Sequence, residues 1–550
     1  MRHHATNNLK RHSDRPRRGS VLVVVLVVVA LLALGAYTFS EMMLVEAEAT
    51  SMYARRVQTR AMADSGVELV TALLGDSLDP RDIGLYHDPG QFQGVEVLAG
   101  ERAALTGRFS IVAPIEADPE FRQVRFGLMD ESARINVNAI LDMELDTSAF
   151  ELDAVDENGD EDLDLPRELA QREVLMGLPG MTEEIADCIL DWIDDDDDVR
   201  EFGAESSYYE GVGVPYPPRN GPIPEIDELL KVKGVTSWML YGEDANRNGL
   251  LDPNEDDGDA RPPVDDEDGV LTLGWSGLLS TSAREVNLRA DGDEKLNVNQ
   301  GLLTDLYDAL EEEFDEDTAK FVVAYRMYGS TDDPETGDWP VEEPSDPVTR
   351  GELNLARGYR REIKSIYELV GITVTADEEG DNGGQVYTYQ SPWDGDPGSM
   401  SSYLPDFVDA LTTSDGPYID GRINVNQARR EVLLGVPGMT EELVDEILAA
   451  RGVDQKTGEI SQDVLDSRAT SGWLVAEGLV DLPTMRELDP FLTARGAIFR
   501  MQVIGHFDAG GPFTRLEAVV DATGDLPKVT FTRDLTELGK GYSYQLLVPD

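Results

Sequence analysis

The chain has 550 residues, more than one hydrophobic core usually organises, so about two to four domains are expected. Its 108 acidic and 46 basic residues give a formal net charge of −62, which excludes nucleic acid and anionic lipid surfaces as general partners. The one cysteine excludes an intramolecular disulfide, and no nucleophile elbow, phosphate loop or zinc-protease motif is present. The sequence therefore predicts no catalytic residues, no enzyme activity and no small-molecule substrate.

A basic leader precedes an apolar segment at the N-terminus. Residues 1–19 hold six lysines and arginines against one acid, Asp14. Residues 20–39 carry no charge, and a helix of that length, at about 1.5 Å per residue, spans the roughly 30 Å hydrocarbon layer. Apolar side chains continue at helical spacing through residues 40–75, which predicts one long helix that leaves the membrane. The charge of the leader should keep it in the cytoplasm.

Three interpretations of this N-terminus are open: a cleaved secretory signal, an uncleaved anchor, and a prepilin signal. The apolar run is long for a secretory signal, and the helix continues beyond it. The order Arg17, Arg18, Gly19, Ser20 before an apolar helix resembles the substrates of prepilin peptidase, which would cut between Gly19 and Ser20. Most such proteins have glutamate at the fifth position after the cut, where this chain has Val24.

Short alternating runs predict strands near both ends of the remaining chain. The segments between them read as helices and loops. The predicted fold class is therefore α+β: a pilin-like long helix on a small antiparallel sheet, interrupted by a large helical insertion. The strands are expected at residues 107–113, 124–129, 498–504, 514–520 and 529–531, with the first part of the sheet in 76–132 and its return in 456–550.

The insertion contains an internal repeat. Residues 173–190 and 431–448 are identical at thirteen of eighteen positions, and each holds a Pro-Gly turn between helices. Such turns resemble helix-hairpin-helix and SAM-like domains, but Glu183, Glu184, Glu441 and Glu442 follow them where DNA-binding versions have basic residues. Related Asn-Val-Asn elements at 133–139, 295–300 and 421–427 predict a duplicated module, divided here into a first helical part (133–290) and a second (291–455). An extra copy is possible within 256–420.

The sharpest chemical motif is an EF-hand-like loop at residues 244–255. Short oxygen side chains at alternate positions can reach one hard cation, and Gly249 allows the sharp turn that the loop needs. Pro253 could open an exit helix. A solvated acidic linker is the alternative to a calcium site. The predicted ligands are Asp244, Asn246, Asn248, Leu250 (through its carbonyl), Asp252 and Glu255.

A second carboxylate cluster follows a predicted helix at residues 191–209. Its adjacent carboxylates repel one another, so either solvent tolerates them or a cation bridges them. The weaker acidic segment 156–164 lacks the final acid of an EF-hand loop and is expected to be a flexible loop. The candidate ligands in the second cluster are Asp194, Asp196, Asp198 and Glu205.

Together these features resemble the minor pseudopilin K (general secretion pathway protein K) of bacterial type II secretion. The resemblance implies calcium binding, single-pass insertion in the inner membrane with the bulk of the chain in the periplasm, and a natural absence of the glutamate that Val24 replaces. It also implies a complex with I- and J-type minor pseudopilins at the tip of the pseudopilus. A minor pilin of a type IV pilus is the alternative. The resemblance rests on the N-terminus, residues 130–138, 191–209 and 221–236, and the terminal segments 499–507 and 515–521.

Overall fold

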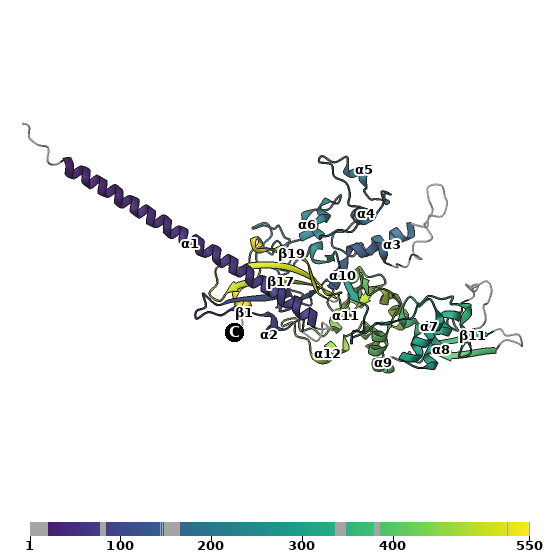
Figure 1. Cartoon of the computed structure of the whole chain (residues 1–550). Helices are drawn as coiled ribbons and strands as arrows, with labels where there is room; N and C mark the ends of the chain where they lie inside the picture. The colour runs from purple at the N-terminus through teal and green to yellow at the C-terminus, as the bar shows by residue number, and fades with distance from the viewer. Residues whose placement is uncertain are drawn as a thin grey trace, which may run out of the picture.

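The computed structural model describes residues 20–76, 84–143, 145, 147, 165–335, 348–378, 385–524 and 526–548. A long N-terminal helix projects from a body that consists of a sheet and a helical insertion (Figure 1). The leader, with Gly19, and the acidic segment 156–164 lie outside the described residues.

Helix α1 (Ser20–Asp76) is continuous over 57 residues, which confirms the predicted single long helix. Its apolar side chains from Val21 to Val45 are exposed, and it is the one helix in the described part of the chain that is long and apolar enough to cross a membrane. The C-terminal half of α1 lies on the sheet and buries Met62, Ala63 and Val67 there. The first charged residue of α1 is Glu41, so its part from Ser20 to Ser40 has no charged side chain to turn toward water.

The central sheet has seven strands, with the order β1-β2-β17-β18-β19 and with β3 on β2 and β4 on β17. Every pairing in it is antiparallel, and all five predicted strand segments belong to it. Because side chains alternate between faces, β17 turns Met501 and Val503 to α1 and turns Arg500 and Gln502 to the insertion. The strands are β1 (Val95–Leu98), β2 (Gly107–Pro114), β3 (Val124–Arg125), β4 (Met129–Asp130), β17 (Ile498–Phe507), β18 (Thr514–Asp521) and β19 (Lys528–Asp534).

The insertion contains three short parallel strand pairs of the same kind. In each pair a strand ending in asparagine lies beside a strand that begins with leucine. The pairs are β5 (Ile135–Asn136) with β6 (Leu279–Ser280), β8 (Leu296–Asn297) with β13 (Leu411–Thr412), and β15 (Ile423–Asn424) with β16 (Leu492–Thr493).

The second asparagine of each Asn-Val-Asn element connects its strand pair to segments that are distant in sequence. Its side-chain amide donates to two distant carbonyl oxygens and its oxygen accepts one N–H, so the same hydrogen-bond set occurs three times. Asn138 donates to Ile223 O and Thr281 O, Asn299 to Ile363 O and Thr413 O, and Asn426 to Arg468 O and Ala494 O; the N–H groups come from Ile223, Ile363 and the Trp473 indole.

The predicted return to the sheet at residue 456 is too early. The third strand pair closes only at Thr493, and the sheet resumes at Ile498. The predicted second part, residues 291–455, also does not match one structural unit. It contains the whole β8–β13 pair but only strand β15 of the β15–β16 pair. The helices between residues 456 and 493 are short, so they carry too few turns to show a helical period: α12 (Gln462–Ser467), α13 (Trp473–Ala476) and α14 (Leu482–Leu488).

Two short helices, α2 (Pro89–Phe92) and α15 (Tyr544–Leu547), pack on the core beneath α1 through Phe92 and Leu547. The other elements build the insertion, which has a separate hydrophobic core. They are α3 (Leu165–Met176), α4 (Glu183–Ile193), α5 (Ser206–Tyr209), α6 (Ser237–Tyr241), α7 (Leu303–Glu313), α8 (Glu316–Tyr328), α9 (Pro397–Ala410), α10 (Arg430–Leu434), α11 (Glu441–Ala450), and the pairs β7 (Arg284–Val286) with β14 (Tyr418–Asp420), β9 (Thr349–Arg350) with β10 (Leu353–Asn354), and β11 (Thr373–Glu378) with β12 (Gln385–Gln390).

Candidate calcium sites

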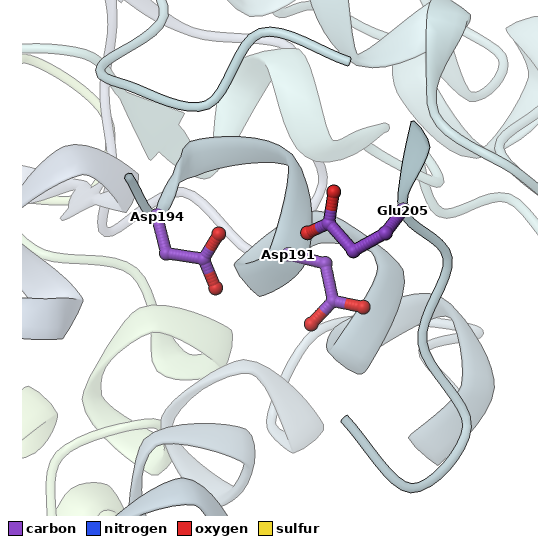
Figure 2. A group of neighbouring side chains, drawn as sticks. All are labelled: Asp191, Asp194 and Glu205. Atoms are coloured by element: carbon purple, nitrogen blue, oxygen red, sulfur yellow. The ribbon is translucent and has the colours of Figure 1, made fainter. Parts of the chain in front are cut away.

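The first site forms where α4 ends. Thr182 caps the start of α4 by accepting from Ile185 N, and Asp191 and Asp194 lie three residues apart at its end, on one face. Glu205 is the residue immediately before α5. Carboxylate oxygens of Asp191, Asp194 and Glu205 lie within 4.8 Å of one another, and Figure 2 shows the three side chains grouped at the helix end.

Asp191 and Glu205 are buried, Asp194 is half-buried, and their negative charges are only partly compensated. Glu205 is 2% exposed, and neither of its carboxylate oxygens has a hydrogen-bond partner among the described residues; the same holds for Oδ1 of Asp194. Burial and neighbouring acids raise the pKa of Asp194 to about 8 and that of Glu205 to about 7. Arg200 is the nearby cation, with nitrogens 3.4 Å from Asp191 and 3.5 Å from Asp194. Unpartnered buried oxygens around one point fit a hard divalent cation.

The structure changes the predicted ligand set at this site. Asp194 and Glu205 belong to the group, whereas Asp196 and Asp198 are exposed and lie outside it. Asp196 is still near enough for its charge to raise the pKa of both Asp194 and Glu205. The sequence prediction missed Asp191, which lies inside the helix.

A glycine makes room for Asp191. A Cβ atom on Gly203 would lie 1.8 Å from Asp191 Oδ2, and the same oxygen accepts a hydrogen bond from Ala204 N at 2.8 Å. The Gly-Ala-Glu segment therefore wraps closely around this carboxylate before it delivers Glu205. The spacing of Asp191 and Asp194 along one helix face was the signal that could have found the missing residue.

The second site is the loop of residues 244–255, which folds around its own acidic side chains. Asp244 accepts from Asn248 N at 2.9 Å and Gly249 N at 2.8 Å, and Gly249 has φ +70°. Glu255 reaches back to accept from Ala245 N at 3.0 Å and Asp252 N at 3.1 Å. Further bonds join Asn246 and Asn248 to Asp252, and Leu250 N to Asn248 Oδ1.

Three of the predicted loop ligands are buried: Asp244, Asn248 and Glu255. Burial raises the pKa of Asp244 to about 6 and that of Glu255 to about 7. Oδ1 of Asn246 is buried without a hydrogen-bond partner among the described residues. Two buried acids and a free amide oxygen within one tight loop fit an oxygen-coordinated cation.

The predicted exit helix after Pro253 is wrong. Helix α6 precedes the loop, but residues 253–270 form turns and extended chain. The physical reason is that the chain doubles back: Asp265 accepts hydrogen bonds from Asp257 N at 3.1 Å and from Gly258 N at 2.8 Å, which replaces helical bonding.

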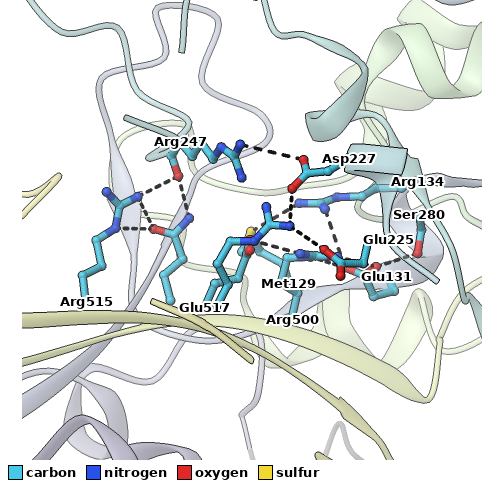
Figure 3. A network of polar contacts seen from close by, with 12 residues as sticks. Met129, Glu131, Arg134, Glu225, Asp227, Arg247, Ser280, Arg500, Arg515 and Glu517 are labelled. Atoms are coloured by element: carbon cyan, nitrogen blue, oxygen red, sulfur yellow. Dashed lines mark hydrogen bonds and ion pairs between the residues drawn. The ribbon is translucent and has the colours of Figure 1, made fainter. Parts of the chain in front are cut away.

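The loop is attached to the central sheet. Arg515, a buried residue of β18, donates to Arg247 O at 2.7 Å (Figure 3). It also donates to Asn246 O at 2.8 Å, and Gln502 of β17 donates to Arg247 O at 2.7 Å. Tyr542 adds a hydrogen bond from its hydroxyl to Asn248 O at 3.1 Å. The loop is therefore also a docking element between the insertion and the sheet.

Comparison with known families identifies this part of the chain. Residues 133–240 match the family model for the type II secretion system (T2SS), protein K. This part of the chain is therefore similar to the protein K family. The carboxylate group of Asp191, Asp194 and Glu205 lies inside the matched residues, and the loop 244–255 follows directly after them.

Two further comparisons accompany the protein K match. No curated protein matched the sequence. A solved structure of the GspK–GspI–GspJ complex from the enterotoxigenic Escherichia coli type 2 secretion system aligned with a TM-score of 0.35 and 11% identity, covering 89% of this chain and 99% of that one.

Proposed function

We propose that this protein is the K-type minor pseudopilin of a type II secretion system, a non-enzymatic subunit of the periplasmic pseudopilus. The observation that carries the proposal is the match to the protein K family in a chain whose N-terminal helix exposes an apolar half. A membrane-anchored assembly subunit needs both parts: a helix that can leave the bilayer and pack among neighbours, and a folded body outside the membrane.

The proposed processing site is the bond between Gly19 and Ser20. Cleavage by prepilin peptidase at this bond would leave Ser20, a residue of helix α1, as the new N-terminus. Before cleavage, the basic leader holds the N-terminus in the cytoplasm, and the body lies in the periplasm on the far side of the inner membrane. Val24 leaves the mature N-terminal amine of this chain without an internal carboxylate near it in sequence.

The proposed partners are I- and J-type minor pseudopilins. The solved GspK–GspI–GspJ complex contains that combination for another protein, and I- and J-type subunits are therefore the partners to test first. The proposed role is the tip of the pseudopilus in protein export across the outer membrane.

The proposed cofactor is calcium, which would supply positive charge to the two carboxylate sites. Asp191, Asp194 and Glu205 would hold one ion through their grouped oxygens, with Asp196 close by. Asp244, Asn246, Asn248, Asp252, Glu255 and the Leu250 carbonyl would hold another. Both sites exist only in the folded chain, because folding brings their ligands together. Calcium would therefore bind the folded state alone and raise its stability.

The insertion is proposed to consist of SAM-like modules that arose by duplication. The threefold hydrogen-bond set of Asn138, Asn299 and Asn426 supports three copies, and the second would account for much of the segment 256–420.

The test of secretion compares a deletion strain complemented with the wild-type chain, with Gly19→Ala, and with Gly35→Ala as the matched control. A Cβ on Gly35 meets nothing within 4 Å, so this control makes the same Gly→Ala change in the helix and leaves the cleavage site intact. The wild-type and Gly35→Ala chains should restore exoprotein release, and Gly19→Ala should leave exoproteins trapped in the periplasm. Normal release from the deletion strain would refute the secretion role, and lost piliation there would favour a type IV minor pilin.

The calcium proposal is tested by thermal unfolding of the detergent-solubilised chain in calcium or in a chelator. Calcium should raise the midpoint, and Glu205→Gln and Glu255→Gln should each remove part of that increase. Glu201→Gln is the matched control, because Glu201 is exposed and, within the described structure, its carboxylate pairs with Arg172 alone, at 3.4 Å. An equal calcium effect in all four proteins would contradict both sites.

A further inference from the structure

A cavity of about 390 Å³ lies where the sheet, the first part of the insertion and the start of α10 meet. Its volume is within the range of sites that bind small ligands. Six arginines and eight carboxylates line it, in a chain with only 46 basic residues among 550. We call it the arginine cavity, and its arginines are Arg134, Arg247, Arg284, Arg429, Arg500 and Arg533.

Four of these arginines are already paired with carboxylates. Arg500 binds Glu131 at 2.6 Å and Glu517 at 3.0 Å, and Arg533 binds Asp227 and Glu225 (Figure 3). Arg284 pairs with Asp420 at 2.7 Å, and Arg247 lies 3.8 Å from Asp227. Their charges are compensated by the protein itself.

Arg134 is poorly compensated. Among the described residues its guanidinium donates one hydrogen bond, to the thioether of Met129 at 4.0 Å, and it lies 3.6 Å from the carboxylate of Glu131. Glu131 is occupied by Arg500 and by the Ser280 hydroxyl at 2.5 Å. A guanidinium carries five N–H donors, so most donors of Arg134 are left for the cavity.

Arg429 is less compensated still. Among the described residues its guanidinium forms no ion pair and no hydrogen bond, and it lies over the ring of Phe121, with its carbon 4.8 Å from the ring centroid. Burial lowers the pKa of both Arg134 and Arg429, and the charge of Arg429 also lowers the pKa of Arg134. An anion that enters the cavity beside these two guanidinium groups would accept hydrogen bonds from N–H donors that the lining carboxylates leave unused.

We propose that the arginine cavity binds the carboxylate of a short peptide segment from a partner protein, held by Arg134 and Arg429. A planar carboxylate matches the guanidinium fork. A dianionic phosphate would meet stronger repulsion from the eight lining carboxylates. The cavity wall also contains apolar side chains, including Met129, Ile223 and Phe531, which suit the body of a peptide. This inference goes beyond the secretion role; Asp244 and Asn248 of the acidic loop form part of the cavity wall, so binding is tested with calcium present.

The experiment measures binding of acetyl-Ala-Val-Leu with a free carboxylate to the detergent-solubilised full chain by calorimetry, in calcium-containing buffer. Its C-terminal amide and inorganic phosphate at equal ionic strength are the comparison ligands. The variants are Arg134→Gln and Arg429→Gln. Arg60→Gln is the control, because Arg60 is a surface residue of α1 paired with Asp64 and Asp534.

The free carboxylate should bind the wild type and Arg60→Gln alike, and each cavity variant should weaken binding by at least about tenfold. Equal binding of the amide, unchanged binding by the variants, no binding to the wild type, or a preference for phosphate would overturn the proposal. If Arg134→Gln loses its circular dichroism, Arg429→Gln decides alone, because this side chain makes no hydrogen bond within the described structure whose loss would unfold the protein.

Discussion

His506 on β17 is a buried imidazole in an unusual setting. It is 2% exposed, and neither ring nitrogen has a hydrogen-bond partner among the described residues. Burial is the main cause that lowers its pKa to about 4 from 6.5, and Lys540 and Arg108 act in the same direction, against the opposing charge of Asp508. The ring packs edge-on against Tyr544, with centroids 5.8 Å apart.

Acid should therefore destabilise the fold through this residue. The folded pKa lies below the unfolded one, so the unfolded chain binds the extra proton, and stability falls as pH drops from 6.5 to about 4. The loss reaches about 3 kcal/mol at the acidic end.

His506→Phe should remove that part of the pH dependence. Chemical unfolding of both proteins at pH 7 and pH 4.5 measures it, and the difference between the proteins cancels the titration of the acidic sites. Parallel pH profiles for the two proteins would contradict the assignment.

At the scale of single residues, the sequence indicated which acidic residues are candidate ligands, but it did not indicate which of them lie together in the folded chain. Asp194 and Glu205 stand out in a run of acids and a Gly-Ala-Glu segment, and both lie in the observed group. Asp191 was not predicted as a ligand, because an aspartate within a helix usually lies on its solvent-exposed face. Residues 200–205 fold back onto α4 and bury its side chain.

At the scale of elements, α1 and β17 approach so closely that only glycine fits. A Cβ on Gly505 would lie 2.1 Å from Thr59 O and 2.9 Å from Ala63 N, both backbone atoms of α1. Helix α1 also has a glycine in this contact, since a Cβ on Gly66 would lie 2.6 Å from Val503 Cγ1 on β17.

Gly505→Ala should force helix and sheet apart and lower the free energy of unfolding by roughly 1–3 kcal/mol. Gly524→Ala is the control, because a Cβ there meets nothing within 4 Å. Denaturant unfolding measures both changes, and an equal effect of the two substitutions would show that the close contact is absent in solution.

The asparagine bonds predict how the insertion is held together. Asn299→Ala removes bonds of 2.8 Å to Ile363 O, 3.3 Å to Thr413 O and 2.9 Å from Ile363 N, which should cost about 2–3 kcal/mol. Amide exchange at Ile363 should become faster, while exchange within the central sheet should not change. Gln462→Ala, which removes an exposed bond to Asp466, should leave both rates unchanged.

At the scale of the whole molecule, Arg515 connects the sheet to the acidic loop. It has no exposed surface and donates to Asn246 O, Arg247 O and Gln502 Oε1. Its distance of hundreds of residues from the loop in sequence makes this contact purely tertiary.

Arg515→Met should lower the free energy of unfolding by about 3 kcal/mol, because buried carbonyls lose charged donors. It should also weaken calcium binding several-fold, since the loop loses its support. Calcium titration and denaturant unfolding measure the two effects, with Arg60→Met as the surface control. Full calcium affinity in Arg515→Met would show that the loop folds independently of the sheet.

The sequence by itself determined the long apolar helix, the five main strand segments, the repeat and the acidic character of both sites. These features follow from local periodicity, charge and spacing, which act over a few residues. The tertiary structure alone decided that β16 closes the third strand pair at Thr493, that Asp191 joins Glu205, and that six arginines meet in one cavity. Such groupings depend on segments brought together by burial, and burial is a property of the whole chain, which no local pattern records.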